Sequence, residues 1–211
     1  MEIHNIRHEF KREKLELENL NINPFNQFDE WFNIAVKEIE LDPNAMSLAT
    51  VGANLQPSLR TVLLKYYDKN GFVFFTNYES RKSKEIIGNP KVSLLFFWVS
   101  LERQIIIEGT AEKISKAESL KYFASRPFGS QLGAWVSNQS SIISSKSMLL
   151  SKWEEMKNKF KDGKIPLPDF WGGYRVLPTR FEFWQGGENR LHDRFEYMKD
   201  GDKWVINRLA P

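Results

Sequence analysis

The spacing of apolar residues predicts an amphipathic helix near the start of the chain. The apolar residues recur at intervals of three and four, with Asn26 as a candidate N-cap. They are Phe28, Trp31, Phe32, Ala35, Val36 and Ile39. An aromatic stripe of this kind is typical of a helix that packs on a core. Residues 1–23 are dense in charge, so we expect a mobile N-terminal arm ahead of a single domain over residues 24–211.

Beyond Pro43 the pattern changes to the alternation of apolar and polar residues that predicts strands. The expected strands are residues 46–51, 59–67, 72–76, 91–99, 101–114, 174–185, 194–199 and 203–208. Helices are expected at residues 80–87, 115–125 and 144–160, the second opened by a capping box of Ser115 and Glu118. Antiparallel strands with helices between them predict an α+β fold, a closed or split antiparallel β-barrel with peripheral helices.

Composition narrows the function classes. The chain has 211 residues, 41% of them apolar, which is enough for one sizeable core. A net charge of +3 gives no reason to expect a polyanionic partner, although a modest positive field favours small phosphorylated molecules. The absence of cysteine excludes disulfides, thiolate nucleophiles and cysteine-ligated zinc. Motifs of the form GxGxxG or GxxxxGK[ST] do not occur, which argues against dinucleotide and P-loop sites.

Two further features bear on metals and location. His4 and His8 stand four residues apart, but no carboxylate–histidine signature accompanies them, so we expect solvated side chains and no metal site. The first residues lack an apolar leader, and the run Val92–Val99 is too short to span a bilayer. We therefore expect a cytoplasmic protein without membrane contact.

Two basic segments are candidate anion sites. In a strand, Arg60 and Lys65 would point to opposite faces and would serve two different anions, or simply reach solvent. Arg81 and Lys82 stand at a probable helix start, where free N–H groups and the helix dipole favour an anion. Because basic residues are otherwise unfavourable at that end of a helix, their presence there favours a phosphate-binding role.

A third candidate is the stretch 183–194, in which Gly186 and Gly187 are followed by alternating charged and polar residues. If the chain is extended there, Arg190, His192 and Arg194 share one face. A glycine hairpin with a solvated charged rim is an equally ordinary explanation of the spacing.

The string WQGGENRLHDR at 184–194, with the terminal NRLAP at 207–211, resembles the C-terminal region of the pyridoxine (pyridoxamine) 5'-phosphate oxidases. Four more segments are similar to that family: RTVLLK at 60–65, SRK at 80–82, ERQ at 102–104 and AWVSNQSS at 134–141. The resemblance spans about residues 24–211. It implies a split barrel of the flavin mononucleotide (FMN) type that works as a homodimer with its FMN sites at the interface.

By that likeness the chain would oxidise pyridoxine and pyridoxamine 5'-phosphates to pyridoxal 5'-phosphate, with O2 as the acceptor, H2O2 as product and ammonia released from the amine. The implied cofactor residues are Arg60, Thr61, Val62, Leu63, Leu64, Lys65, Phe75, Thr76, Arg81, Lys82, Gln104, Gln139, Ser140, Trp184 and Arg194. The implied substrate residues are Arg7, Phe10, Lys65, Tyr122, Arg126, Ser130, Arg190, Leu191 and His192. Arg190 and His192 would orient the pyridine ring as the catalytic pair.

The chain departs from the family pattern at two positions. Arg7 is retained in the N-terminal lid, but Phe10 stands where the family commonly has tyrosine, and Phe75 also often appears as tyrosine. The loss of a hydroxyl at Phe10 leaves a non-catalytic flavin or pyridoxal-phosphate carrier as an alternative function. A nucleic-acid-binding barrel is a second alternative because aromatic residues make up 14% of the chain, although the near-neutral charge argues against it.

Overall fold

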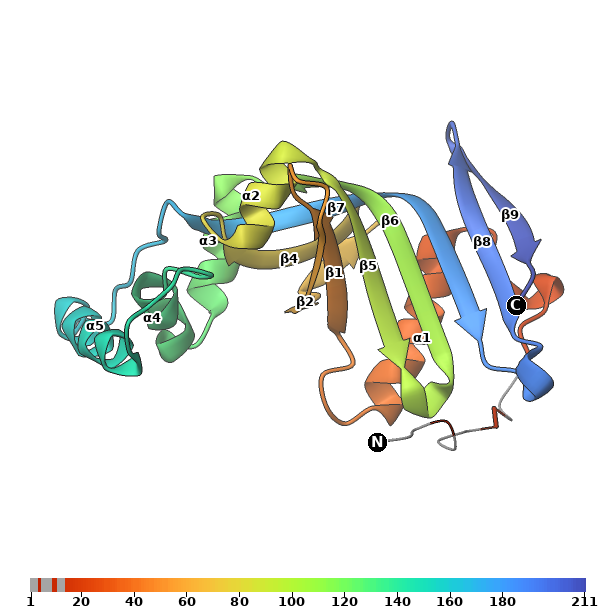
Figure 1. Cartoon of the computed structure of the whole chain (residues 1–211), viewed down its shortest axis with the longest axis horizontal. Coiled ribbons are helices and arrows are strands. Elements are labelled where there is room, and N and C mark those ends of the chain that lie inside the picture. The colour runs from red at the N-terminus through yellow and green to blue at the C-terminus, as the bar shows by residue number, and fades with distance from the viewer. Residues whose placement is uncertain (1–3, 5–8, 11–13) are drawn as a thin grey trace.

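The computed structural model describes His4, Glu9, Phe10 and residues 14–211. In this part of the chain nine strands form one curled antiparallel sheet (Figure 1). The strands are β1 Ala45–Val51, β2 Pro57–Leu63, β3 Tyr66–Asp68, β4 Gly71–Asn77, β5 Lys91–Trp98, β6 Arg103–Lys113, β7 Trp171–Gln185, β8 Asp193–Asp200 and β9 Lys203–Leu209. The order is β2-β1-β5-β6-β7-β4-β3, with β8 paired to β7 and β9 to β8. The expected split barrel with peripheral helices is confirmed.

Strand β7 splits the barrel because its two halves have different partners. Residues 171–176 pair with β4 and residues 180–185 pair with β8, while β6 follows almost the whole strand. Between the halves Thr179 is an extra residue, since Glu108 pairs with Arg180 and Gly109 with Pro178. A proline cannot donate to the ladder and is tolerated at such a bulge. The bulge bends the strand, which allows its ends to diverge.

Helix α1, Pro24–Glu38, packs against the sheet through its aromatic stripe. The rings of Phe28 contact those of Phe72 and Phe96 at centroid distances of 4.8 and 5.2 Å. The N-cap is Asn23, whose side chain accepts from the Phe25 amide, and not Asn26 as expected, because Pro24 already occupies the first turn. The expected helix is otherwise confirmed, except that Val36 of the predicted stripe is 52% exposed and does not face the core.

The expected strand at 59–67 is divided into β2 and β3. Leu64 turns into the core and donates its amide to Asn44 O, while Lys65 donates to Val73 O. The backbone therefore moves at this point from the neighbourhood of β1 to that of β4. Apolar periodicity does not detect this crossing because the residues on both sides of it are strand formers.

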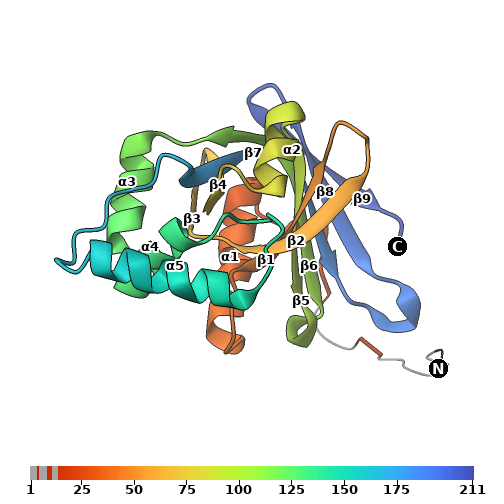
Figure 2. The same cartoon turned by 60° about the vertical axis from the view of Figure 1, so that its left-hand side comes forward.

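The remaining helices are α2 Arg81–Gly88, α3 Lys116–Ser125, α4 Phe128–Val136 and α5 Lys146–Lys159. The capping box at Ser115 and Glu118 is confirmed. Figure 2 shows α3, α4 and α5 gathered at the side of the sheet away from β8 and β9, where they enclose a second apolar cluster around Phe123 and Trp171. Helix α4 was not predicted, because it is short and contains Gly129 and Gly133.

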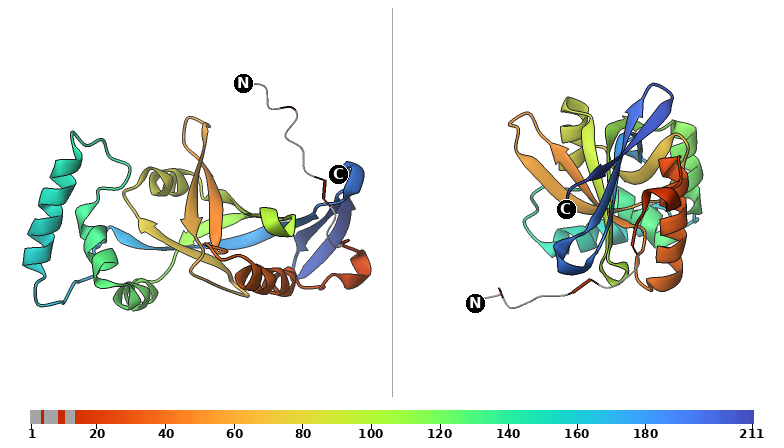
Figure 3. Two further views of the ribbon diagram at one scale, coloured as in Figure 1. Left: turned by 90° about the horizontal axis from the view of Figure 1, so that it is seen from below. Right: turned by 90° about the vertical axis from the view of Figure 1, so that its right-hand side faces the viewer.

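Residues 14–23 lie against the C-terminal strands (Figure 3). Leu15 is buried, and its amide donates to Asp193 Oδ2 at 3.1 Å. The Tyr197 hydroxyl donates to Asn21 O at 2.8 Å. These contacts join residues 14–23 to the domain, whereas the sequence analysis placed them in the arm. Arg7 lies outside the described residues. None of the helices that the structure describes is long and apolar enough to cross a membrane.

Candidate active site

A pocket of about 410 Å³ lies between β2, β4, α3 and α4, and we call it the cationic pocket. Its walls are Thr61, Val62, Leu63, Lys65, Phe75, Thr76, Asn77, Lys82, Tyr122, Arg126, Ser130, Gly133, Ala134, Ser137, Gln139 and Trp171. Eight of the fifteen implied cofactor residues line this pocket. The four residues that the resemblance implies for the substrate phosphate, Lys65, Tyr122, Arg126 and Ser130, line it as well. Arg60 and Leu64 are the exceptions in the segment 60–65, because Arg60 contacts Glu85 and the Leu64 side chain is buried in the barrel core.

Lys82 lies at the start of α2 and is only 7% exposed. Its Nζ donates to Thr76 Oγ1 at 3.1 Å and to Gln139 Oε1 at 2.9 Å, which are uncharged partners. Burial, together with repulsion by Arg60, lowers the pKa of Lys82 to about 8 although Glu85 opposes the shift. An anion bound against Nζ would relieve this cost.

Arg126 lies at the end of α3, and its guanidinium lies over the Trp171 ring at 4.7 Å. Its Nη1 is buried and has no hydrogen-bond partner among the residues that the structure describes. Burial lowers the pKa of Arg126 below its ordinary range, although the nearby Tyr122 opposes the shift. A buried guanidinium N–H without a partner is costly unless a ligand accepts from it.

Aromatic rings form one wall of the cationic pocket. The Phe75 ring is stacked on Tyr122 at 3.9 Å and on Trp171 at 5.3 Å. Phe75 therefore makes ring contacts within the wall, which a tyrosine at this position would also make. Trp171 was missed by the sequence analysis, since no pattern links it to Arg126, 45 positions earlier in the chain.

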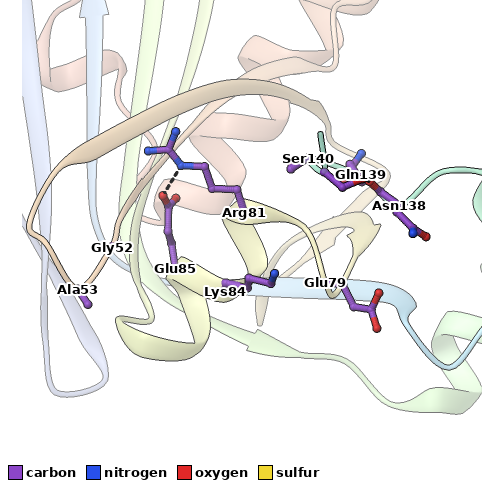
Figure 4. Close-up of a pocket in the computed structure, with 10 residues that line it drawn as sticks. Gly52, Ala53, Glu79, Arg81, Lys84, Glu85, Asn138, Gln139 and Ser140 are labelled. Carbon is purple, nitrogen blue, oxygen red and sulfur yellow. Dashed lines mark hydrogen bonds and ion pairs between the residues drawn. The ribbon is translucent and has the colours of Figure 1, made fainter. Parts of the chain in front are cut away.

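A second pocket, of about 640 Å³, adjoins the cationic pocket at Gln139 (Figure 4). It includes Arg81 and Ser140, two more of the implied cofactor residues. Arg81 Nε donates to Glu85 Oε1 at 2.9 Å, and Arg60 Nη2 lies 3.2 Å from Glu85 Oε2. Although burial opposes it, hydrogen bonds from Ser58, Thr50 and the two arginines lower the pKa of Glu85 to about 2.

Glu85 thus holds Arg60 and Arg81 together, and the two cations retain one net positive charge. The sequence analysis missed this role. The spacing of four residues on a helix is a local signal that predicts the ion pair between Arg81 and Glu85. No local pattern predicts the ion pair between Arg60 and Glu85. Arg60 and Lys65 have different surroundings, since Lys65 lines the cationic pocket while Arg60 contacts Glu85. The expected reason, alternation along one strand, is wrong because β2 ends at Leu63.

The other implied cofactor residues lie on the sheet. Phe97 pairs with Gln104, Gln104 with Trp184, and Trp184 with Arg194, so they form one cross-strand row through β5, β6, β7 and β8. Paired residues in antiparallel strands project from the same face. Gln104, Trp184 and Arg194 therefore share a face although they are up to 90 positions apart in the chain.

The connection between β7 and β8 carries the implied catalytic pair. His192 Nδ1 accepts from the Gly187 amide at 3.1 Å, and the His192 ring lies 4.7 Å from that of Trp184. A Cβ atom at Gly187 would lie 2.3 Å from Leu191 O, so the turn requires glycine. Phe10 packs edge-on against both rings at 5.5 Å.

Arg190 and Leu191 lie on this connection, and their side chains are exposed. Arg190 has a left-handed backbone with φ of 64°. Figure 1 places this connection and helix α4, which lines the cationic pocket, at opposite ends of the molecule. Within a single chain, Arg190 and His192 are therefore not brought to the implied substrate-phosphate residues.

The comparisons with known proteins agree with this arrangement. Residues 32–160 match the family described as Pyridoxamine 5'-phosphate oxidase, and residues 171–211 match the Pyridoxine 5'-phosphate oxidase C-terminal dimerisation region. The chain is 60% identical to a pyridoxine/pyridoxamine 5'-phosphate oxidase of Crocosphaera subtropica and 56% identical to one of Aliarcobacter butzleri, with 100% of each chain covered.

Solved structures agree as well. PhzG from Burkholderia lata 383, in complex with tetrahydrophenazine-1-carboxylic acid, superposes with a TM-score of 0.90 at 26% identity, covering 97% of this chain and 100% of that one. An FMN-binding protein from Nostoc punctiforme superposes with a TM-score of 0.72 over 91% of this chain and 100% of that one, and its 15% identity shows the fold alone. By the two matched segments and the full-length identity, the chain belongs to the pyridoxine/pyridoxamine 5'-phosphate oxidase family.

Proposed function

We propose that this protein is an FMN-dependent oxidase that converts pyridoxine 5'-phosphate and pyridoxamine 5'-phosphate to pyridoxal 5'-phosphate. Dioxygen is the electron acceptor and H2O2 the product, with ammonia released from the amine. The observation that carries the proposal is the buried Nη1 of Arg126, which has no partner among the described residues and belongs to the cationic pocket. With Lys65, Tyr122 and Ser130 it offers the charge and the donors that a phosphate monoester needs.

The residues present also fit a flavin phosphate. The buried ammonium of Lys82 contacts uncharged oxygens of Thr76 and Gln139, and Arg60 with Arg81 share the single carboxylate of Glu85. These groups leave positive charge for the phosphate, while Gln104, Trp184 and Arg194 would contact the ring system. Bound FMN supplies the hydride acceptor and the centre that reduces dioxygen.

The protein's own task is to fix the two rings and the two phosphates relative to one another. Arg126 and Lys65 would anchor the substrate phosphate, and Arg190 with His192 would orient the pyridine ring. Because the Gly187 amide donates to His192 Nδ1, the proton of the neutral imidazole is on Nε2, which is the nitrogen left to donate to the substrate. No side chain has to act as a nucleophile.

The match of residues 171–211 to a dimerisation region indicates a homodimer. We infer that each active site is shared, with Arg190 and His192 of one subunit completing the cationic pocket of the other. The separation of the two groups within one chain supports this. The sheet face that carries Gln104 and Trp184 also exposes apolar side chains, Leu59 at 66% and Phe97 at 57%, which suit a surface covered by a second subunit.

The test begins with the absorbance spectrum of the purified protein. We expect a yellow protein that releases FMN on denaturation and produces H2O2 and pyridoxal 5'-phosphate when either substrate is added. Changing both Arg81 and Lys82 to alanine should weaken FMN binding. A bound flavin adenine dinucleotide, or no flavin after reconstitution, would contradict the cofactor assignment. Flavin binding without turnover would favour the non-catalytic carrier.

A further inference from the structure

Glu182, in the C-terminal half of β7, belongs to none of the groups of site residues described above. Its side chain is 4% exposed, in a segment of otherwise apolar character between Phe181 and Phe183. A carboxylate so deeply buried is costly unless charged donors satisfy both of its oxygens.

Two arginines satisfy Glu182. Arg194 brings Nε to 2.9 Å and Nη2 to 2.8 Å from Glu182 Oε1, and Arg180 brings Nη2 to 2.7 Å from Oε2. Arg180 is held in turn by Glu196 and Glu108, at 3.0 and 3.2 Å. We call these five residues the carboxylate cluster: Glu108, Arg180, Glu182, Arg194 and Glu196.

The cluster fixes the direction of the Arg194 side chain. Two of its nitrogens are directed to Glu182, and Nη1 donates to Ala210 O at 2.8 Å. The guanidinium is thus held on two sides, by Glu182 and by Ala210 O. These contacts fix the directions in which its remaining N–H groups can donate. Arg194 pairs across the strands with Trp184, in the row that also contains Gln104.

We propose that Glu182 is a positioning residue for the flavin. It orients the guanidinium of Arg194 toward the flavin ring and neutralises its charge, so that Arg194 acts as a fixed hydrogen-bond donor and not as a free cation. This inference rests on the proposed function, in which Arg194 contacts the cofactor. In metal sites, loss of a partner that orients a direct ligand typically costs about 10- to 100-fold in affinity, and we expect an effect of the same order here.

The test compares two substitutions that remove the same charge from the same cluster. Glu182→Gln removes the carboxylate shared by Arg194 and Arg180, whereas Glu196→Gln removes a partner of Arg180 and of Asn207. The FMN dissociation constant, measured by quenching of flavin fluorescence on binding to the apoprotein, should rise about 10- to 100-fold in Glu182→Gln. It should stay at the wild-type value in Glu196→Gln.

A double-mutant cycle with Arg194→Ala tests whether Glu182 acts through Arg194. In the Arg194→Ala protein, adding Glu182→Gln should not weaken FMN binding further. If Glu182→Gln does not fold, Glu182→Asp keeps the charge but withdraws the carboxylate by one methylene, and it should also weaken FMN binding. Equal affinities for Glu182→Gln and Glu196→Gln, or additive losses with Arg194→Ala, would overturn the inference. A wild-type protein that binds no FMN would instead contradict the proposed function.

Discussion

The cationic pocket and the carboxylate cluster both contain buried basic side chains, but they stabilise them by opposite means. In the pocket, Lys82 donates to hydroxyl and amide oxygens and Arg126 lies on an indole ring. In the cluster, Arg180 and Arg194 contact three carboxylates. The pocket therefore keeps positive charge that a ligand can neutralise. In the cluster, the carboxylates already neutralise the charge of the arginines.

This difference separates two kinds of recognition. An unneutralised cation in a desolvated pocket suits a phosphate, whose charge it can compensate. A neutralised arginine in a fixed orientation suits the polar edge of a ring, where geometry matters more than charge. We therefore expect substitutions in the cationic pocket, and in the residues that complete it, to act mainly on phosphate binding and on substrate turnover.

Replacing Arg126 with methionine should have the largest effect. The change removes donors to the substrate phosphate from a buried site while keeping an apolar contact with Trp171. Two charge-assisted hydrogen bonds at about 1.5–3 kcal/mol each predict a fall in kcat/KM of about 100-fold or more. Steady-state kinetics with pyridoxine 5'-phosphate measure it, and FMN affinity should be retained. The matched control is Lys116→Met, which removes an exposed paired cation. A fall of the same size in the control would contradict the phosphate role.

Replacing Arg190 with leucine should affect the substrate and not the flavin. Loss of one charge-assisted hydrogen bond of about 1.5–3 kcal/mol corresponds to a fall in kcat/KM of roughly 10- to 150-fold. Anaerobic stopped-flow mixing with pyridoxine 5'-phosphate should show weaker binding or slower flavin bleaching. Glu188→Gln, on the same turn, is the control. Unchanged bleaching in Arg190→Leu would show that Arg190 is a surface charge only.

Mixing these two variants tests whether the active site is shared between subunits. A dimer of one Arg126→Met chain and one Arg190→Leu chain contains one site with both changes and one with neither. It should recover about half of the wild-type activity per dimer, although the parent dimers keep about a tenth of it or less. Differently tagged chains allow the mixed dimer to be purified and assayed. If verified mixed dimers stay as inactive as their parents, each site is built from a single chain.

The pKa of Lys82 predicts a pH dependence of FMN affinity. A phosphate at Nζ favours the ammonium form, so affinity should be highest below pH 8 and should fall by up to about tenfold per unit above it. The stability of the unliganded protein should change with pH in the opposite direction. Between about pH 8 and pH 10.5 the unfolded state binds more protons at Lys82 than the folded state, so the free energy of unfolding rises with pH. Fluorescence titrations of wild type and Lys82→Met check the first trend. Parallel curves would show that Lys82 does not contact the phosphate.

The sequence predicts the local elements well and the long-range contacts poorly. The stripe on α1 and the capping box at Ser115 follow from intervals of three and four residues, which local patterns record. Local patterns do not predict the division of the strand at Leu64, because hydrogen bonds to distant residues decide it. They do not predict the helix that begins at Phe128 either, because that helix depends on packing against Trp153. The N-cap of α1 was also misplaced, because the cap lies at Asn23, directly before Pro24 in the first turn.

The site shows the same limit. Resemblance identified Lys65, Lys82 and Arg126, and the structure brings them into one pocket. It did not identify Glu85 or Glu182, the carboxylates that hold the arginines. A charged residue between Phe181 and Phe183 reads as the solvent face of a strand, and only the arginines on β7 and β8 make its burial possible.

The position of β7 at the centre of the sheet also sets the order of events during synthesis. One edge of β4 pairs with the preceding strand β3, but the other edge, over Phe72 to Asn77, finds its partner only in residues 171–176. These residues come about 100 positions later, or roughly 5–20 s at ordinary elongation rates. During that interval the apolar run Phe72–Phe75 has an uncovered strand edge, which is a template for pairing with other chains. The nascent chain is therefore most vulnerable to aggregation just before residues 171–185 emerge, and faster elongation through residues 78–170 should raise the soluble yield.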